Sequence, residues 1–326
     1  MGRNIAVGVG LAEYPFATAS GFWRWIDLCE AGGVDSFWQT DRLVSRHPIL
    51  ECLAALAAVA GRTRRMKVGM NVLSLAMRDP LLAAKQCATI DALSDGRMLP
   101  GFGIGSPLAP EWKALGLDTG TRGARTDEAL EVIRRLWSEE RVDFAGRHFR
   151  MEGASIAPRP VQRELPMWIG GGSEAAVRRT ARFGTGWQAG PEGPEQAGAV
   201  IAAIKRALAE TGRTIEEDHY GAGVPFLFGD PDDPALRGAY DAYRARTGRE
   251  PGGYFAVGDA ETIIGRIGEY VAAGASKFIL RPVARDEGTM LEQTRRLVEE
   301  VLPIIAARWP KAGRAGALPS SSSVSI

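Results

Sequence analysis

The chain has 326 residues, of which 45% are hydrophobic and 24% are charged, so it is long enough and apolar enough to bury a sizeable core. Forty Lys and Arg residues stand against 39 Asp and Glu residues, which gives a formal net charge of +1. This balance excludes a global field that would attract nucleic acid or an anionic membrane, so any anion-binding site must be local.

The cysteines and the apolar runs indicate where such a chain resides. Cys29, Cys52 and Cys87 form no CxxC pair and fall on segments with helical apolar spacing, so we expect reduced, buried thiols and a cytoplasmic location. The first residues lack the apolar run of a signal peptide, and no stretch reaches the ~18 apolar residues of a spanning helix. We therefore expect no membrane partner and no nucleic-acid partner.

Short segments rich in Val, Ile, Phe and Gly alternate with longer segments of helical apolar spacing, a pattern typical of βα units. Asp79 and Pro80 supply an N-cap and a first-turn proline for one such helix, which Asp95 and Gly96 close. Eight units of this kind close most simply into a (β/α)8 TIM barrel, an α/β fold. The expected strands are Ile5–Gly10, Ser36–Thr40, Lys67–Leu75, Arg97–Gly105, Pro166–Gly171, Gly186–Gly190, Tyr220–Phe228 and Lys277–Val283.

Two connections are too long for plain βα loops, and they predict insertions after strands four and seven. Residues 106–165 include VDFAGRHFRM, which predicts a hairpin around Ala145 and Gly146, and residues 229–258 are rich in Asp, Pro and Gly. Loops of this length usually carry function or cover a site. We expect one barrel domain over residues 1–310 and a disordered tail at 311–326, which lacks any apolar period.

Functional groups in a TIM barrel gather on the loops after the strands. After the fifth expected strand, GGGSEA (residues 170–175) opens a helix whose free N–H groups would hold a phosphate, and glycine would allow it to approach closely. A tight turn with Ser173 as the helix cap explains the same residues equally well. GFGIGS (residues 101–106) also has two interpretations, because alternating glycines in a strand occur where the barrel interior is crowded or where a flat ligand lies against the backbone.

Metal and nucleophile chemistry have less support. His47, His148 and His219 lack the spacing of metal ligands, so we expect no metal site. No G-x-S-x-G elbow occurs, and Lys277 stands at the start of the eighth strand, the wrong end of the barrel for a Schiff base. A barrel without these groups predicts chemistry that is borrowed from a cofactor.

Four segments in order resemble the luciferase-like monooxygenase superfamily and its flavin- and deazaflavin-dependent oxidoreductases: LSDGRMLPGFGIGS, RGARTDEALEVIRRLW, DFAGRHF and PMWIGGGSEAAVRRTARFGTGW. The resemblance runs from about Gly8 to about Ile305. It implies a barrel that binds reduced FMN or the deazaflavin coenzyme F420 at the strand ends, often within a homodimer. It also makes the backbone after strand five the candidate phosphate site, namely Gly170, Gly171, Gly172 and Ser173.

The resemblance implies further cofactor contacts. KVGMNVLSLAMRDP resembles the strand whose bulge, commonly with a non-prolyl cis peptide, supports the flavin ring, which places Asn71, Val72 and Ser74 against the cofactor. Asn71 and Ser74 are alternatively ordinary polar residues of the barrel interior. The remaining candidate cofactor contacts are Asp41, Gly103, Gly105 and Ser106.

The candidate catalytic residues are Arg42, His47 and Glu13. Where the family often has Asp-His at the end of strand two, this chain has Asp41-Arg42. Arg42 can bind an anion or stabilise negative charge, but it cannot act as a general acid or base near neutral pH. His47, five residues on, or Glu13, after strand one, could replace the missing histidine, unless both are solvated loop residues.

Two further observations concern the substrate. Ser106 stands where the family's sugar-phosphate dehydrogenases tend to carry a glutamate, which argues against that specific activity. Arg42, Arg46, His47 and Arg281 form either a basic rim for an anionic substrate or cofactor tail, or scattered surface charges.

The sequence favours an oxidoreductase in which reduced FMN activates O2 to oxygenate a small organic substrate, with the reduced flavin supplied by a separate reductase. Hydride transfer with the deazaflavin F420 is the alternative, and it needs the same cavity without oxygen. A flavin-binding barrel with little turnover, for storage or partner binding, is a second alternative. A metal-free aldolase-type or hydrolytic barrel is disfavoured by the missing nucleophiles.

Overall fold

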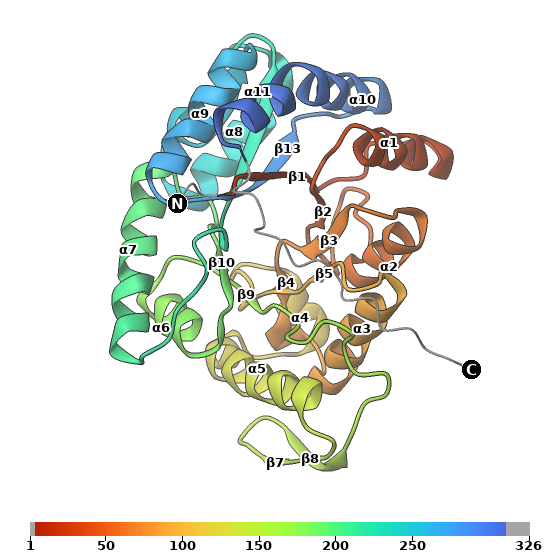
Figure 1. Ribbon diagram of the computed structural model, residues 1–326, viewed down its shortest axis with the longest axis vertical. Coiled ribbons are helices and arrows are strands. Elements are labelled where there is room, and N and C mark those ends of the chain that lie inside the picture. Colours follow the sequence, from red (N-terminus) through yellow and green to blue (C-terminus); the bar gives the residue numbers. More distant parts are fainter. Residues whose placement is uncertain (1–3, 311–326) are drawn as a thin grey trace, which may run out of the picture.

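The computed structural model describes residues 4–310, and a closed ring of parallel strands lies at its centre (Figure 1). Each strand pairs with the next one, and β13 pairs with both β11 and β1, which closes the ring. The predicted (β/α)8 barrel is thus confirmed. In chain order the ring contains β1 (Ala6–Leu11), β2 (Ser36–Gln39), β3 (Lys67–Met70) and β4 (Leu73–Ser74), β5 (Met98–Leu99) and β6 (Gly101–Gly103), β9 (Trp168–Gly170), β10 (Gly186–Gln188), β11 (Tyr220–Phe228) and β13 (Lys277–Pro282).

The third and fourth strands differ from their predicted form because each is divided in two. Between β3 and β4 the Asn71–Val72 peptide is cis, as the resemblance predicted. The two halves stay in register, because β3 pairs with β5 and β4 pairs with β6. The chain therefore bulges near the middle of this wall without opening the ring.

Helices cover the outside of the ring (Figure 1). Their starts follow from local capping: before α3 the Asp79 carboxylate accepts a hydrogen bond from the Leu82 amide at 3.0 Å, and Pro80 takes the first helical position. The helices are α1 (Ala19–Ala31), α2 (Cys52–Arg62), α3 (Pro80–Leu93), α5 (Arg122–Ser138), α6 (Glu174–Phe183), α7 (Pro194–Glu210), α9 (Ala260–Ala272), α10 (Glu287–Arg296) and α11 (Leu302–Arg308).

The two insertions carry their own small elements. The first holds α4 (Glu111–Leu115) and the predicted hairpin, β7 (Val142–Ala145) and β8 (Arg150–Ala154), which extends away from the barrel beyond α5 (Figure 1). The second holds α8 (Pro234–Thr247) and β12 (Ala256–Gly258), which pairs with β11 and which the sequence did not predict. The predicted tail at 311–326 lies outside the described residues.

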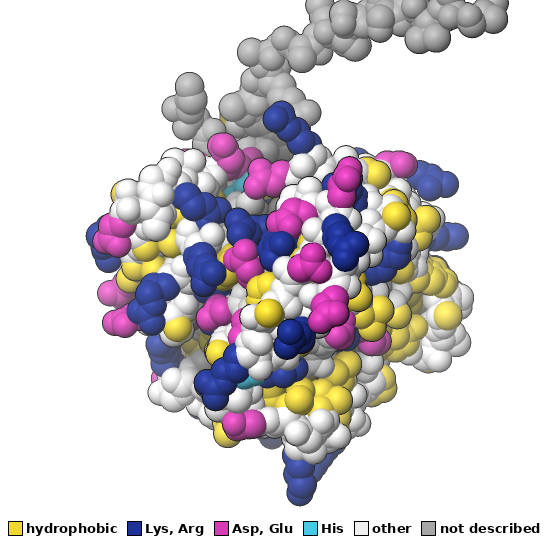
Figure 2. All heavy atoms as spheres, turned by 90° about the horizontal axis from the view of Figure 1, so that it is seen from below, with side chains coloured by type: hydrophobic (Ala, Val, Ile, Leu, Met, Phe, Trp, Pro, Cys, Tyr) yellow, Lys and Arg dark blue, Asp and Glu magenta, His cyan; other side chains and the backbone are white. Residues whose placement is uncertain are grey.

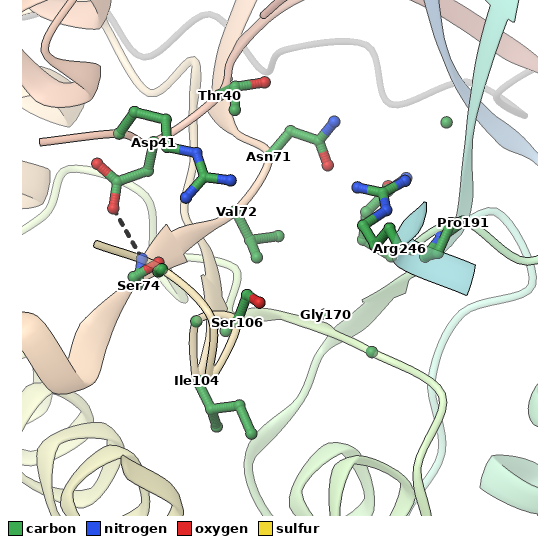
Figure 3. Close-up of a pocket in the computed structure, with 18 of the residues that line it drawn as sticks. Thr40, Asp41, Asn71, Val72, Ser74, Ile104, Ser106, Gly170, Pro191 and Arg246 are labelled. Atoms are coloured by element: carbon green, nitrogen blue, oxygen red, sulfur yellow. Dashed lines mark hydrogen bonds between the residues drawn. The ribbon is translucent and has the colours of Figure 1, made fainter. Parts of the chain in front are cut away.

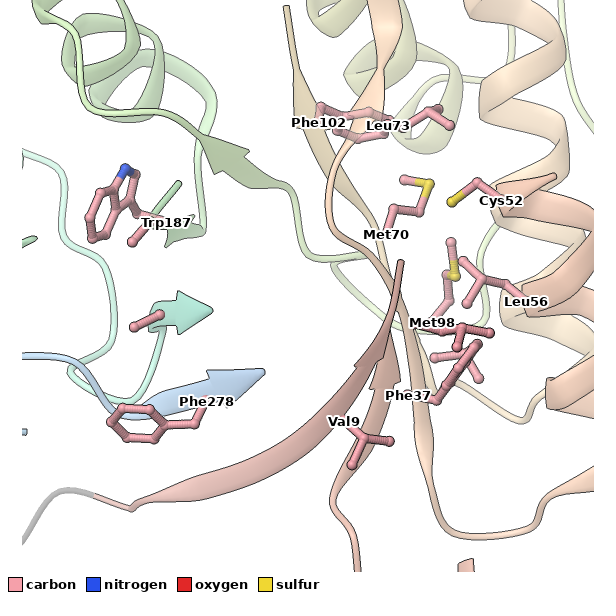
Figure 4. Close-up of a cluster of buried hydrophobic side chains, with 14 of the residues drawn as sticks. Val9, Phe37, Cys52, Leu56, Met70, Leu73, Met98, Phe102, Trp187 and Phe278 are labelled. Atoms are coloured by element: carbon pink, nitrogen blue, oxygen red, sulfur yellow. The ribbon is translucent and has the colours of Figure 1, made fainter. Parts of the chain in front are cut away.

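The main core lies between the ring and its helices. Outward side chains such as Phe37 and Met70 pack against Cys52 and Leu56 of α2 (Figure 4). All three cysteines are buried and free. This layer explains why the strands read as nearly continuous apolar runs, since their outer faces meet helices and their inner faces meet one another.

The inside of the barrel is closed at one level by two indoles. Trp38 and Trp168 are 0% and 2% exposed, and their rings meet edge to face at 6.0 Å. Glycines on the neighbouring strands make room for them, because a Cβ at Gly69 would lie 2.5 Å from the Trp38 ring and one at Gly186 2.6 Å from the Trp168 ring. We call this layer, which also contains Leu99 and Ile279, the indole floor.

The surface charges and the apolarity of the helices concern the expectation of no nucleic-acid partner and no membrane partner. On the face drawn in Figure 2, Lys and Arg side chains are interspersed with Asp and Glu side chains. Among residues 4–310, no helix combines the length and apolarity that crossing a bilayer requires.

A buried ion pair joins the amino-terminal ends of two strands. Lys277, at the start of β13, donates a hydrogen bond to the Asp35 carboxylate, and Lys67 lies 3.8 Å from the same group. Burial raises the pKa of Asp35, but the two ammonium groups and the hydrogen bonds from Lys277 and Ser36 outweigh it and lower this pKa to about 2. Lys277 therefore serves the stability of the barrel at the end predicted to be unsuited to catalysis.

We expect the Asp35 carboxylate to stabilise the fold above pH 4 and to lose this contribution as the pH falls from about 4 to about 2, because its pKa is lower in the folded chain than in the unfolded chain. The contribution is about 2 kcal/mol. Urea unfolding of the wild type and of Asp35→Asn between pH 5 and pH 2.5 measures it. The difference between the two free energies of unfolding should shrink over this range, and a difference independent of pH would contradict the assignment.

Candidate active site

A cavity of about 420 Å³ opens at the carboxyl ends of the barrel strands (Figure 3). Its wall comes from the ends of several strands and from the second insertion, as expected for a barrel in which loops after the strands carry function. Of the residues expected at the site, those lining the cavity are Asp41, Arg42, Asn71, Val72, Ser74, Gly103, Gly105, Ser106, Gly170 and Gly171.

The bulge between β3 and β4 projects Val72 into the barrel (Figure 3). A Cβ at Gly103 would lie 2.6 Å from a methyl group of Val72, and a Cβ at Gly170 would lie 3.1 Å from both methyl groups. These two glycines are therefore required by the bulge itself. The sequence left GFGIGS open between a crowded interior and a flat ligand, and for Gly103 the structure shows a crowded interior.

Asp41 holds the bulge in place. Its carboxylate accepts a hydrogen bond from the Ser74 amide at 2.9 Å and from Arg78 at 2.6 Å, and its side chain is 3% exposed. Arg78 also lies 3.0 Å from the Glu51 carboxylate. Both oxygens of Asp41 are thus engaged by the protein, so this residue positions β4.

Arg42 is joined to Glu111, a carboxylate after the fourth strand to which no role was assigned from the sequence. Glu111 of α4 has a side chain that is 3% exposed, and its Oε2 lies 3.6 Å from an Arg42 nitrogen. Its Oε1 accepts hydrogen bonds from the amides of Leu43 and Val44 at 3.3 and 3.4 Å. Glu111 therefore ties the loop after β2 to the first insertion and offsets the charge of Arg42 at the cavity wall.

The glycine stretch after β9 forms one end of the cavity. Gly171 has φ +109°, a conformation that favours glycine, and its carbonyl accepts a hydrogen bond from the Trp187 indole at 2.8 Å. We call Gly170, Gly171 and Gly190, which line the cavity here, the glycine cradle. Arg246 of α8 lies beside Pro191 at this end (Figure 3).

Two expected phosphate contacts lie just behind this cradle. Ser173 caps α6 by accepting a hydrogen bond from the Ala176 amide at 3.2 Å, as in the helix-cap interpretation. Gly172 faces Glu192, whose Oε1 would lie 2.7 Å from a Cβ at this position. The Glu192 Oε2 atom is buried without a hydrogen-bond partner in the described chain. The cradle thus has a carboxylate behind it, which the sequence did not predict.

The structure does not bring Glu13 and His47 into the cavity wall. Both are exposed on loops that are joined outside it by a hydrogen bond from the Tyr14 amide to the Pro48 carbonyl at 2.8 Å. In this arrangement both side chains stay in solvent outside the cavity wall. Arg46 is likewise exposed and outside the wall.

Several wall residues were missed by the sequence analysis, or named there only as part of a rim: Gln188, Tyr254, Arg246 and Arg281. The signal for two of them was the two-residue period of a strand, which places Gln188 with Gly186 and Arg281 with Ile279 on the inner face of the ring. Tyr254 and Arg246 belong to the second insertion, whose path the sequence does not predict. Residues 4–310 contain no group of His, Cys, Asp and Glu side chains arranged to hold a metal ion.

We expect Asp41→Ala to lower the free energy of unfolding by about 2 kcal/mol, because it leaves the Ser74 amide without its acceptor and Arg78 with Glu51 alone. Urea unfolding measures the change. Asp232→Ala, at an exposed carboxylate of the second insertion that does not line the cavity, is the control. Equal stabilities of the two variants would show that Asp41 does not hold the bulge.

Comparisons with known proteins agree with this architecture. The family described as luciferase-like monooxygenase matches residues 6–254, more than half of the chain. An uncharacterised protein of Mycobacterium tuberculosis is 34% identical over 168 residues, covering 51% of this chain and 57% of that protein. The F420-dependent glucose-6-phosphate dehydrogenase of Kineococcus radiotolerans is 31% identical over 217 residues, or 63% of each chain. The chain thus spans less than two thirds of these relatives' length.

Solved structures show the same fold at lower identity. An F420-dependent secondary alcohol dehydrogenase in complex with an F420-acetone adduct has a TM-score of 0.79 at 19% identity, covering 91% of this chain and 98% of that one. Monooxygenase RslO1 from Streptomyces bottropensis has a TM-score of 0.79 at 21% identity, covering 93% and 100%. Apart from the uncharacterised protein, the proteins named here are F420-dependent dehydrogenases and a monooxygenase, which are oxidoreductases. The chain belongs to the luciferase-like monooxygenase family.

Proposed function

We propose that this chain is an oxidoreductase that binds a flavin-type cofactor in the barrel cavity and transfers a hydride between it and a small organic substrate. The observation that carries the proposal is the shape of the cavity, with an inward bulge at Asn71 and Val72 on one wall and the glycine cradle at one end. A cavity of about 420 Å³ is of the size that holds small-molecule ligands. When bound, the cofactor would supply the hydride chemistry, and the chain would bind, orient and shield it from water.

The residues present fit such a cofactor. Val72 offers an apolar surface to a ring system, and Asn71 lies beside it with its amide directed into the cavity (Figure 3). The backbone of Gly170, Gly171 and Gly190 has no side chains to keep a phosphate away, and Arg246 supplies a positive charge at this end.

The charges around the cradle favour the deazaflavin F420 over FMN. At the phosphate position itself, the monoester of FMN carries a charge of about −1.5 to −2 at neutral pH, whereas the phosphodiester of F420 carries a single charge and the carboxylates of its tail lie farther along that tail. Glu192 lies behind the cradle and opposes the added negative charge, while Arg246 is exposed and weakly attractive. The F420 dependence named for the relative from Kineococcus radiotolerans supports the same choice.

A monooxygenase that uses reduced FMN is the second candidate, and the state of the cavity carboxylates favours it. Both oxygens of Asp41 accept hydrogen bonds, from Ser74 and Arg78. The Glu111 carboxylate is held at Oε1 by two amides of the loop after β2, and the Arg42 charge lies 3.6 Å from its Oε2, which accepts no hydrogen bond in the described chain. His47 lies outside the wall. Dehydrogenation of an alcohol needs a base for the hydroxyl proton, whereas oxygenation does not, so a shortage of available bases favours the oxygenase.

Equilibrium titration of the purified apoprotein with FMN and with F420, followed by cofactor fluorescence, distinguishes the two. We expect F420 to bind at least about tenfold more tightly than FMN, a difference of about 1.4 kcal/mol. Gly172→Val should weaken binding of either cofactor by about tenfold or more, because a valine must displace Glu192 and Val200 and thereby move the cradle.

The matched control for this titration is Gly265→Val, at an exposed helical glycine with nothing within 4 Å of the added Cβ. It should leave both affinities unchanged. Tighter binding of FMN than of F420 would select the oxygenase, and absence of binding by either cofactor would refute both candidates.

We expect Glu192→Gln to strengthen FMN binding by about tenfold, because the variant removes a negative charge next to the cradle while keeping the shape of the side chain. Riboflavin, which lacks the phosphate, should bind wild type and variant equally. Fluorescence titration of both ligands measures this, with Glu195→Gln in the first turn of α7 as the exposed control. A similar gain for riboflavin would show that Glu192 acts on the ring or the ribityl chain.

A further inference from the structure

The wall opposite the bulge contains an unusual run of small residues. In the ring of strands, β11 lies across the barrel from β3 and β4, and its inner face carries Gly221 and Gly223. A ring system that rests on Val72 leaves the remaining space in front of this wall. What lies over these two glycines therefore decides which group of a substrate this space accepts.

Gln188 lies over the first of these glycines. Its Oε1 atom occupies the space that a Cβ at Gly221 would need, and the residue is 1% exposed while lining the cavity. Neither its amide nitrogen nor its amide oxygen has a hydrogen-bond partner in the described part of the chain. A buried amide without partners is costly, so this side chain is arranged to meet a polar group that enters the cavity.

Arg281 lies over the second glycine, Gly223. Its guanidinium carbon is 3.8 Å from a Cβ position at Gly223, and its Cγ is 2.8 Å from a Cβ position at Gly10, so glycines on both neighbouring strands make room for it. It donates a hydrogen bond to the hydroxyl of Tyr254, which also lines the cavity. Unlike Arg42 and Arg78, it has no ion-pair partner among residues 4–310.

We propose that Gln188, Arg281 and Tyr254 form a niche that binds the carboxylate of the substrate, so that the substrate is a small organic acid. This inference rests on the proposed function for the redox step, while the binding itself belongs to these three side chains. The Arg281 guanidinium supplies the single positive charge that a carboxylate needs and a planar pair of donors. The Gln188 amide and the Tyr254 hydroxyl each add a donor from a second direction.

The same composition argues against other ligand groups. A phosphate dianion would call for a second cation, and of the other arginines that line the cavity Arg42 is paired with Glu111 and Arg246 is exposed. A neutral apolar group would leave the Gln188 amide and the Arg281 charge without partners inside the cavity. A single carboxylate can accept a hydrogen bond from the Gln188 amide and also balance the charge of Arg281.

The test uses hexanoate and hexanamide, which have the same chain length and differ in charge. We expect isothermal titration of the cofactor-loaded protein to give at least about tenfold tighter binding of hexanoate. Arg281→Met and Gln188→Glu should each abolish this preference, the first by removing the cation and the second by placing a negative charge in the niche. Arg285→Met, at an exposed arginine outside the wall, is the matched control and should keep it.

Circular dichroism and the affinity for the cofactor are measured on the same variants. A native spectrum and unchanged cofactor affinity in Arg281→Met, with the hexanoate preference lost, support the niche. Equal binding of hexanoate and hexanamide by the wild type, or a preference retained in Arg281→Met, would overturn it. A tenfold loss of cofactor affinity in Arg281→Met would also overturn it, because Arg281 would then belong to the cofactor site.

The proposed function can fail independently of this niche. If neither FMN nor F420 binds, the redox assignment falls, and the same titration is made on the cofactor-free chain, where the hexanoate preference and its loss in Arg281→Met should still be seen. Cofactor binding without any hexanoate preference gives the converse result, which leaves the proposed function in place and refutes the niche.

Discussion

The space inside the barrel is limited, so a large inward side chain on one strand requires a glycine on a strand beside it. This constraint decides where the interior is filled and where it stays open. At the level of the indole floor, Trp38 and Trp168 fill the interior, and Gly69 and Gly186 give way to them. Toward the carboxyl ends of the strands, Val72 projects inward from the bulge, and Gln188 and Arg281 project from the wall across the barrel. The cavity is the space that remains between these side chains above the indoles.

Glycine has three different structural roles in this chain. Gly103 and Gly170 are small because Val72 occupies the space beside them, which is a packing requirement of the bulge. Gly171 is different, since its φ of +109° favours glycine whatever lies nearby. Gly221 and Gly223 make a third case, because the groups that they admit are polar and line the cavity. A sequence shows all of these as the same letter.

Local signals made much of the fold predictable. The strand periodicity, the Asp79-Pro80 helix start and the hairpin around Ala145 and Gly146 depend on residues close together in the sequence, and the structure contains all three. β12 escaped prediction because its three residues become a strand only by pairing with β11, far away in the chain. The bulge in the third strand was predicted only through the family resemblance, since the polar residues Asn71 and Ser74 in the run from Lys67 to Leu75 also fit an unbroken strand with polar groups in the barrel interior.

The candidate site was predictable in part for the same reason. Positions that follow from strand order, such as Asn71 and Gly171, line the cavity, because every strand end meets at one face of the barrel. The roles of Glu111 and Glu192 could not be predicted, because each depends on a contact that only the folded chain makes. Glu111 contacts Arg42, and Glu192 lies against the backbone at Gly172. His47 was named because it lies five residues after Arg42, and Glu13 because it follows the first strand, and neither position along the chain determines whether a loop turns inward.

The distribution of charge separates the two ends of the cavity. Asp41 and Glu111, on the side of β2, are engaged by arginines and amides, so that side is close to neutral. The cradle end has Arg246 in front and Glu192 behind, and the wall of β11 and β13 has Arg281 with a tyrosine hydroxyl as its partner. Because one family fold serves proteins named for an alcohol, a sugar phosphate and oxygenation, the residues that distinguish substrates should lie on the wall facing the bulge, where Gln188 and Arg281 stand.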